Sequence, residues 1–414
     1  MAKLKPFKAY RPRTKLVKRV AALPYDVMNS EEARAIGRDN PHSFLHVDKA
    51  EIDLDPAINT HSKVVYEKAR DNLQAMIEDD ILIQDKEEKY YIYKQIMDGR
   101  SQVGLVGCAS IDDYIEGKIK KHEFTRADKE EDRINHVDYT NAHTGPIFLT
   151  YRKNKEISSI IDEYMNKEKS EYDFVSEDGI RHVVWVIDDK KTIEDLTKLF
   201  KDIENLYIAD GHHRSASAIK VALRRRKEFP DYDGSEEFNC FLTVLFPDED
   251  LYIMDYNRVV KDLNGNTPDE LIEKIRGKFE IKAYQGEGQF KPGEKNVFGM
   301  YLDEKWYELR AKEGIFNPKD PVERLDVSIL QDNILDPILA IKDPRTDKRI
   351  DFVGGIRGLD ELEARVKSDM KIAFSLYPTS IEDLISISDA GEVMPPKSTW
   401  FEPKLRSGIF IHKL

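Results

Sequence analysis

The spacing of apolar and polar positions predicts strands and helices that alternate along the whole chain. Residues 89–109 have the pattern of a β-hairpin, with aromatic and β-branched residues on both sides of an Asp98-Gly99 turn. Other apolar runs bounded by turn residues predict further buried strands, and these runs are residues 20–27, 145–151, 182–188, 206–209, 239–246 and 251–260. We expect the last two of these strands to pair with each other.

Apolar residues three and four positions apart predict helices between the strands. The predicted helices cover residues 30–39, 62–79, 192–200 and 212–226, and Asn29-Ser30 is a cap at the start of the first. Residues 165–178 are polar and typical of a connection. The pattern therefore predicts an α+β protein with mixed α/β organisation.

The organisation of the chain changes after residue 263. Beyond that point the pattern predicts a smaller mixed unit with a hairpin over 297–311 and a helix over 325–340. A chain of 414 residues is too long for one ordinary core. We predict three regions: an N-terminal α/β region over 1–150, a central region over 151–263, and a C-terminal mixed α/β region over 264–414 that ends in a basic Pro-Pro-Lys-Ser-Thr tail.

Composition narrows the class of protein. The chain is 40% hydrophobic and 35% charged, which is typical of a globular protein, and its net charge of −13 argues against a general nucleic-acid binder. The only cysteines, Cys108 and Cys240, support neither a disulfide framework nor a cysteine-rich zinc site. Apolar runs stay well below the roughly 20 residues that span a bilayer. We expect a cytoplasmic protein without a membrane or nucleic-acid partner.

The stretch from Leu206 to Ala218 combines the most reactive groups. An apolar run ends at Asp210, Gly211 allows a sharp turn, and a helical pattern begins near His212. The start of a helix gathers backbone N–H groups and a positive dipole, which favours an anion such as phosphate. His213, Arg214 and the hydroxyl of Ser215 add donors. The alternative is that Asp210 simply caps an ordinary helix.

A second dense segment runs from Lys118 to Arg133. Such a charged run usually forms a solvated helix face. Here His122 and Glu123 precede a helix predicted to begin near Arg126, and polar residues continue to the strand at 145–151. A carboxylate, a histidine and arginines between two strands favour an acid–base site over a bare surface.

The last residues contain a proline-stiffened, basic stretch from Met394 to Gly408. Lys397 and Lys404 are the candidates there for contact with an anion. The alternative is a solvated extension of the chain.

Two resemblances follow from these motifs. Asp210-Gly-His-His-Arg214 resembles the signature of the ParB/sulfiredoxin-like superfamily, whose strand–glycine–helix corner holds nucleotide phosphates. Together with further motifs, it also resembles domain-of-unknown-function family ten-fifteen (DUF1015), which is associated with serine biosynthesis. The further motifs are Pro24-Tyr-Asp-Val27, His122-Glu-Phe-Thr125 with Glu130 and Asp132-Arg133, Gly145-Pro-Ile-Phe148 and Met394-Pro-Pro-Lys-Ser-Thr399. Asn257 departs from the pattern, which leads us to expect a histidine there.

The resemblance implies a ParB/sulfiredoxin-like nucleotide-binding core in region 151–263 and an ATP-dependent kinase that phosphorylates free L-serine to O-phosphoserine. On this hypothesis the nucleotide phosphates bind Gly211, His212, His213, Arg214 and Ser215. The expected base is Glu123, with His122 as its partner. The serine carboxylate or the transferred phosphate would bind Arg126, Arg133, Lys397 and Lys404. Mg²⁺ is expected as a cofactor. Asp210 is a further catalytic candidate, which faces Mg²⁺ directly or through water, or is only a cap.

Other functions stay open at this point. ADP or another nucleotide could replace ATP, and the acceptor could be a similar small hydroxy compound. A nucleotide-binding switch or DNA-associated module resembling ParB is one alternative, although no helix-turn-helix pattern supports it. A metal-dependent hydrolase that uses the histidines near 122–143 and 212–213 is another. The sequence assigns no metal ligands and no oligomeric state.

Overall fold

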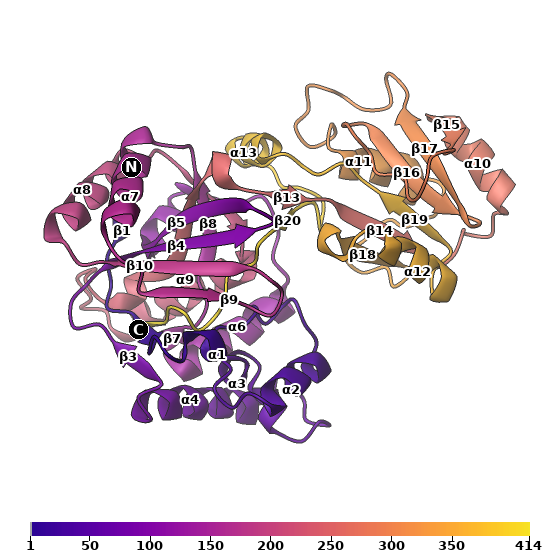
Figure 1. The fold of residues 1–414 in the computed structure, drawn as a ribbon. Coiled ribbons are helices and arrows are strands. Elements are labelled where there is room, and N and C mark those ends of the chain that lie inside the picture. The colour runs from indigo at the N-terminus through magenta and orange to yellow at the C-terminus, as the bar shows by residue number, and fades with distance from the viewer. Residues whose placement is uncertain (1) are drawn as a thin grey trace. The chain divides into compact units, whose positions relative to one another are not determined.

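The computed structural model describes residues 2–414, which form two compact units. The first unit comprises residues up to 121, 125–251 and 403–414, and the second comprises 122–124 and 252–402. Each unit has its own sheet with helices around it, so the fold is mixed α/β as predicted (Figure 1). The predicted region boundaries after residues 150 and 263 stay predictions.

A nine-stranded mixed sheet organises the first unit, in the order β6-β11-β8-β12-β5-β4-β10-β9 with β1 paired to β5. Only the pairs β11–β6 and β12–β8 are parallel. The strands are β1 (Leu4–Lys5), β4 (Tyr90–Met97), β5 (Arg100–Ser110), β6 (Ile119–Lys120), β8 (Ile147–Tyr151), β9 (Tyr172–Val175), β10 (Arg181–Ile187), β11 (Leu206–Asp210) and β12 (Cys240–Pro247). Two short pairs, β2 (Tyr10–Pro12) with β3 (Leu82–Gln84) and β7 (Ala142–His143) with β21 (His412–Lys413), lie beside it.

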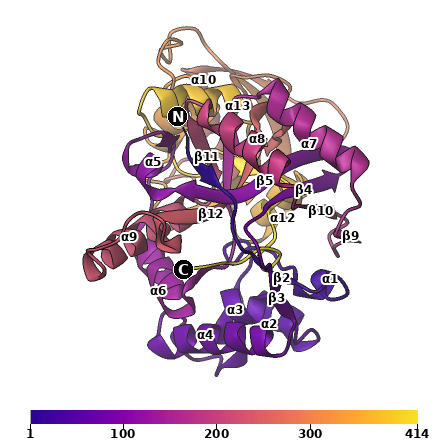
Figure 2. The ribbon, with the colours of Figure 1, turned by 90° about the vertical axis from the view of Figure 1, so that its left-hand side faces the viewer.

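Helices cover both faces of this sheet. Figure 2 shows α7 and α8 on one side, and α6 with the small helical layer α2–α4 on the other. The helices of the first unit are α1 (Val17–Val20), α2 (Ser30–Arg38), α3 (Leu45–Asp48), α4 (Lys63–Glu78), α5 (Ile111–Ile115), α6 (Ala127–Thr140), α7 (Lys155–Lys167), α8 (Lys190–Lys201) and α9 (His212–Glu228). Single 3₁₀ turns add residues 50–53, 237–239 and 248–250.

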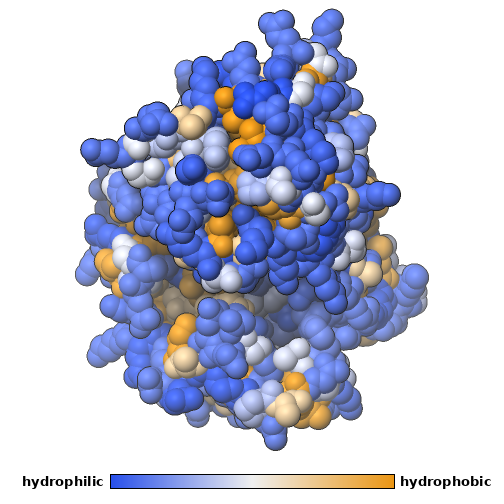
Figure 3. Space-filling model, turned by 90° about the vertical axis from the view of Figure 1, so that its right-hand side faces the viewer, coloured by the Kyte–Doolittle hydropathy of each residue, from blue (hydrophilic) through white to orange (hydrophobic). Residues whose placement is uncertain are grey.

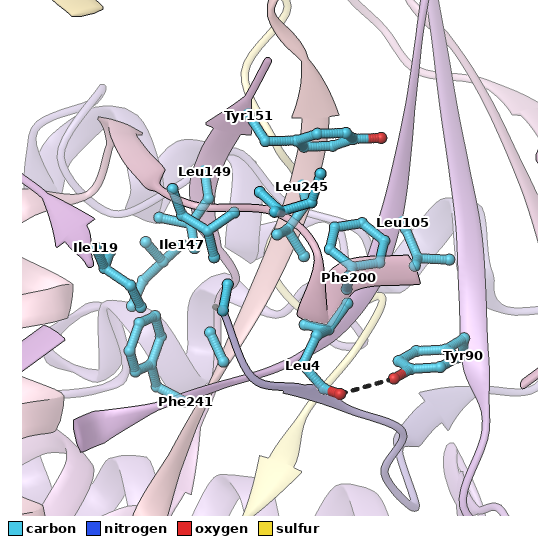
Figure 4. Close-up of a cluster of buried hydrophobic side chains, with 14 of the residues drawn as sticks. Leu4, Tyr90, Leu105, Ile119, Ile147, Leu149, Tyr151, Phe200, Phe241 and Leu245 are labelled. Atoms are coloured by element: carbon cyan, nitrogen blue, oxygen red, sulfur yellow. Dashed lines mark hydrogen bonds between the residues drawn. The ribbon is translucent and has the colours of Figure 1, made fainter. Parts of the chain in front are cut away.

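The largest core of the first unit lies between the sheet and helices α7, α8 and α9. Alternate residues of several strands point into it, such as Leu149 and Tyr151 of β8. Figure 4 shows Phe200 of α8 among these strand residues and the Tyr90 hydroxyl, which donates to the Leu4 carbonyl at 2.9 Å. The buried tyrosine thus has a partner for its only polar group.

The second unit is built on a six-stranded sheet in the order β15-β17-β16-β19-β14-β18. Its strands are β14 (Tyr256–Val260), β15 (Phe279–Ala283), β16 (Val297–Leu302), β17 (Lys305–Ala311), β18 (Ile350–Gly354) and β19 (Ile372–Ser375), and a separate pair joins β13 (Ile253–Met254) to β20 (Trp400–Phe401). Its helices are α10 (Pro268–Arg276), α11 (Asp326–Leu330), α12 (Asp360–Ser368) and α13 (Ile381–Asp389).

Several predicted elements are confirmed, and four are wrong. The hairpin at Asp98-Gly99 is present, and Asn29 caps α2.

Residues 20–27 form no strand, since α1 ends at Val20 and only Ala22 makes an isolated bridge. Strand β9 lies within the supposed connection 165–178. The helix predicted over 325–340 is limited to α11 and a π turn over 331–335. Strands 239–246 and 251–260 do not pair, because β12 joins the first sheet and β14 the second.

The face shown in Figure 3 is mostly hydrophilic, with small separated apolar areas. Among residues 2–414, no helix combines the length and the apolar character needed to cross a membrane.

Residues 403–414, which we call the C-terminal segment, are embedded in the first unit. Ser407 and Ile411 form bridges to Ala22 and Tyr10, and β21 pairs with β7. Gly408 has a φ of 80°, and a Cβ there would lie 2.5 Å from the Phe44 ring. Glycine is therefore required at 408 both by the backbone and by the lack of space.

We predict that Gly408→Ala destabilises the protein by about 2–4 kcal/mol, through left-handed strain plus overpacking. Gly99→Ala is the matched control, because Gly99 has a φ of 77° and a Cβ there would meet no atom within 4 Å, so that it should cost only about 1–2 kcal/mol. Denaturant unfolding of both variants measures the difference. Equal losses would contradict the proposed contact with Phe44.

Candidate functional site

The predicted strand–glycine–helix corner is present in the first unit. Strand β11 ends at Asp210, Gly211 takes a φ of 95°, and α9 begins at His212. Only glycine adopts this backbone readily, and a Cβ on Gly211 would also lie 3.2 Å from the Arg214 guanidinium. No side chain caps α9, so the predicted cap role of Asp210 is wrong. We call residues 210–215 the β11–α9 corner.

An ion pair joins this corner to the C-terminal segment. Lys404 Nζ donates to Asp210 Oδ2 at 3.0 Å, and the Gly211 N–H donates to Oδ1 at 2.8 Å. Burial disfavours the charged carboxylate, but the positive charges of Lys404 and Arg214 outweigh it and hold the pKa of Asp210 below its usual value. Asp210 is therefore a carboxylate at neutral pH. The pair combines a residue predicted as catalytic with one predicted to bind substrate.

Arg214 connects the corner with the loop before β8. Its Nη1 donates to the Pro146 carbonyl at 2.6 Å, and a Cβ on Gly145 would lie 3.4 Å from Nη1. Its Nε is buried and has no hydrogen-bond partner within residues 2–414. An N–H donor in this state is costly unless a ligand or water satisfies it. Arg214 thus holds the loop through Nη1 and still has its Nε–H group to donate to a ligand or water.

Arg214 also lines a small cavity of about 30 Å³, together with Tyr25, Asp48, Arg133 and Thr144. The Arg133 guanidinium stacks 4.0 Å from the centre of the Tyr25 ring and pairs with Asp132 at 2.7 Å. The Thr144 hydroxyl donates to Asp48 at 2.7 Å. A cavity of this size holds about two water molecules. Arg133, predicted to bind substrate, is therefore buried in a polar network beside Arg214.

The start of α6 lies against α9. The backbone N–H of Arg126 donates to Nε2 of His213 at 3.0 Å, while its guanidinium is exposed and binds Asp128 at 2.8 Å. Glu130 accepts hydrogen bonds from Thr125 and from Lys220 of α9. Burial works against ionisation of Glu130, but Lys220 and Thr125 keep its pKa lowered. Glu130 was among the residues of the predicted motifs, but Lys220 was not. Lys220 follows His213 by seven residues and so lies two turns further along the same face of α9.

Two predicted phosphate ligands are buried in α9. Ser215 is buried, and its hydroxyl donates to the Gly211 carbonyl at 3.1 Å within the first turn. His212 is also buried. At this corner, the backbone of the first turn and the side chains of His213 and Arg214 are therefore the groups best placed for an anion.

The remaining predicted residues belong to the second unit. The carbonyl of buried His122 accepts from the Met394 N–H at 2.8 Å, which places Glu123 next to the Pro-Pro-Lys tail. Arg258 donates to the Lys397 carbonyl at 3.0 Å, and Lys397 Nζ lies 5.6 Å from the centre of the Tyr256 ring. The structure thus collects His122, Glu123 and Lys397 in one unit, and Asp210, Arg214 and Lys404 in the other.

Asn257, where we expected a histidine, is completely buried. Its side chain donates to Asp255 and accepts from the Leu376 N–H at 3.0 Å. The amide therefore has a structural role between β14 and the end of β19.

Comparison with solved structures finds remote similarity. A conserved hypothetical protein from Pyrococcus furiosus has a TM-score of 0.35 at 16% identity, covering 73% of this chain and 93% of that one. A free serine kinase in complex with AMP has a TM-score of 0.36 at 14% identity, covering 77% and 92%. SbnI with a C-terminal truncation, from Staphylococcus aureus, has a TM-score of 0.37 at 11% identity, covering 72% and 82%.

No curated protein matches the chain. A family model does match, and it extends over residues 4–328, well over half of the chain and including the whole β11–α9 corner. The chain therefore belongs to the family described as protein of unknown function (DUF1015).

Proposed function

We propose that the protein is a small-molecule kinase that transfers the γ-phosphoryl group of ATP to the hydroxyl of free L-serine. The observation that carries the proposal is the β11–α9 corner, where a helix start, an ionised Asp210, Lys404 and Arg214 lie together. The predicted ParB/sulfiredoxin-like core belongs to the same proposal and rests on this corner. The structural similarities above have TM-scores below 0.5 and do not contribute.

The corner provides what phosphate binding requires. The first turn of α9 directs backbone N–H groups and the positive end of the helix dipole outward from Gly211. The buried Nε of Arg214 is a donor without a protein partner in the described chain. In this proposal the backbone N–H groups of the first turn and Arg214 bind the phosphates, and the imidazole of His213 lies close to the phosphates. Ser215 is left out of the phosphate site, because its hydroxyl and its backbone N–H both donate to the Gly211 carbonyl.

The residues at the corner fit Mg²⁺ bound mainly by the nucleotide. Both oxygens of Asp210 already accept N–H donors, from Gly211 and Lys404. Protein sites for Mg²⁺ commonly use one or two carboxylates, several waters and the substrate phosphates. Asp210 would therefore hold the ion through water, and the ion would spread the charge that develops during phosphoryl transfer.

The acceptor side of the proposal rests on the sequence. Glu123 is proposed to orient and deprotonate the serine hydroxyl, with His122 as its partner, because in-line transfer needs a carboxylate at the nucleophile. Candidates for binding the serine carboxylate or the transferred phosphate are Arg126, Arg133, Lys397 and Lys404. Of these, Arg133 and Lys404 are already paired with carboxylates inside the first unit. Arg126 pairs with Asp128, but both Arg126 and Lys397 of the tail are exposed and so accessible to a substrate.

The direct test of the reaction is phosphorus NMR of the protein with ATP, Mg²⁺ and L-serine. We expect an O-phosphoserine signal that requires serine, and we expect Glu123→Gln to lower its rate of formation by about 10²–10⁴-fold, as for loss of a general base. Glu131→Gln, at an exposed carboxylate of α6, is the matched control and should keep full activity. ATP consumption without phosphoserine would replace serine by another acceptor or favour a nucleotide switch, and full activity of Glu123→Gln would remove Glu123 from the mechanism.

Arg214→Lys should weaken ATP binding by about 10- to 100-fold, since it removes charge-assisted hydrogen bonds worth about 1.5–3 kcal/mol. The control is Arg224→Lys, three turns further along α9, where the arginine pairs with Asp138. Calorimetric titration with ATP measures both variants, and circular dichroism checks that they fold. An unchanged affinity in folded Arg214→Lys would rule out this residue as a phosphate ligand.

Lys404→Met should reduce stability in a pH-dependent way. Because the pKa of Asp210 is lowered in the folded protein, the pair stabilises it above the ordinary aspartate pKa of about 3.9 and loses this effect as pH falls toward the folded pKa. The variant should thus be less stable by about 1–2 kcal/mol at pH 7, and this deficit should shrink only in strong acid, well below the ordinary aspartate pKa of about 3.9, where Asp210 of the parent becomes protonated.

Lys413→Met is the control for this prediction, because Lys413 belongs to the same C-terminal segment but contacts the Thr140 carbonyl instead. Denaturant unfolding from pH 7 down into strong acid gives the comparison. A deficit that does not shrink at all as Asp210 is protonated would mean that Lys404 stabilises by packing and not through the Asp210 charge.

A further inference from the structure

Two cysteines and a histidine meet in the interior of the first unit. Cys108 lies on β5, Cys240 begins β12, and His412 lies on β21 of the C-terminal segment. The two sulfurs and a ring nitrogen of His412 all lie within 4.8 Å of one another. The three residues are at most 2% exposed. Three metal-binding side chains from distant parts of the chain thus face one point.

A carboxylate completes the group. Glu237, in the 3₁₀ turn before β12, has Oε2 at 2.7 Å from Nε2 of His412 and at 4.0 Å from the sulfur of Cys240. The other ring nitrogen of His412, Nδ1, lies 3.1 Å from Nδ1 of His143. A ligand histidine uses one ring nitrogen for the ion and the other for a polar neighbour, so an ion would take the place of the direct Nε2–Glu237 contact while Nδ1 keeps His143 as its partner.

The donor set is chemically selective. Two thiolates, an imidazole and a carboxylate suit a tetrahedral Zn²⁺ ion, whereas Mg²⁺ and Ca²⁺ prefer oxygen ligands. Two thiolates also neutralise a divalent cation, which lowers the cost of placing the charges in the core. We propose that Cys108, Cys240 and His412 bind a zinc ion, with Glu237 as the fourth ligand.

The strand register argues against a disulfide between the two cysteines. Cys108 lies opposite Leu242, and Cys240 lies opposite Ser110, so the cysteines are diagonal neighbours on one face. Diagonal neighbours have Cα atoms about 7–8 Å apart, and a disulfide needs about 4.4–6.8 Å. A nucleophilic role is also disfavoured, since Cys240 is only 2% exposed and a nucleophile must reach its substrate.

The zinc ion has a defined structural effect. It joins the C-terminal segment, through His412, to two central strands of the nine-stranded sheet. Eight residues before His412, the same segment carries Lys404, the partner of Asp210. The site is separate from the proposed kinase reaction, and its presence does not depend on that reaction.

The test uses the full-length, untagged protein, stripped of metal with a chelator under reducing conditions and titrated with Zn²⁺ against a chromophoric chelator. We expect one tightly bound equivalent. Cys240→Ser and His412→Gln should each weaken binding by more than about 100-fold, because even changes around the ligands cost about 10–100-fold. His42→Gln, in a loop of the same unit, should bind as the parent does.

Co²⁺ provides a second measurement that needs no variant and so does not depend on variant folding. Thiolate coordination should give an intense near-ultraviolet charge-transfer band together with visible bands of a tetrahedral ion. The proposal is overturned by absence of the thiolate band, by zinc binding that Cys240→Ser and His412→Gln leave unchanged, or by a Cys108–Cys240 disulfide in the native metal-free protein.

Discussion

The ion pair between Asp210 and Lys404 is the interaction on which the proposed site depends. It places a carboxylate next to the start of α9, and the lysine comes from a segment 194 residues further along the chain. Alone, a half-buried carboxylate would tend to bind a proton, but the cations of Lys404 and Arg214 keep it charged. The corner therefore holds a fixed arrangement of charges before any ligand binds. Such preorganisation is what phosphoryl transfer demands of a protein.

The C-terminal segment determines whether that pair forms. Gln95 donates to the Lys404 carbonyl at 2.9 Å, and Gly408 lies against Phe44 where no side chain fits. Near the end of the segment, His412 lies in the core beside the other proposed zinc ligands. The segment thus contacts the sheet and the helical layer over its whole length. A substitution that loosens either end of the segment should also disturb the Asp210–Lys404 ion pair. The stability of this part of the fold is thus linked to the proposed function.

Local features of the fold could be predicted from the sequence, and long-range ones could not. The β11–α9 corner was predicted because an apolar run, Gly211 and a helical pattern all fall within a few residues. The partners of β12 and β14 were missed, since adjacent strands in sequence usually pair and here they join different sheets. Lys404 and Asp210 were each predicted as site residues, but their ion pair was not. The Cys108–Cys240–His412 group was missed entirely, because two isolated cysteines form no spacing motif.

Binding of nucleotide phosphates at the β11–α9 corner is the central requirement of the proposed function. A crystal structure of the protein with Mg²⁺ and a non-hydrolysable ATP analogue tests it most directly. We expect phosphate oxygens within hydrogen-bonding distance of the first-turn N–H groups of α9 and of Arg214, with the Asp210–Lys404 pair intact beside them. Phosphates bound elsewhere, with the corner filled only by water, would contradict this assignment.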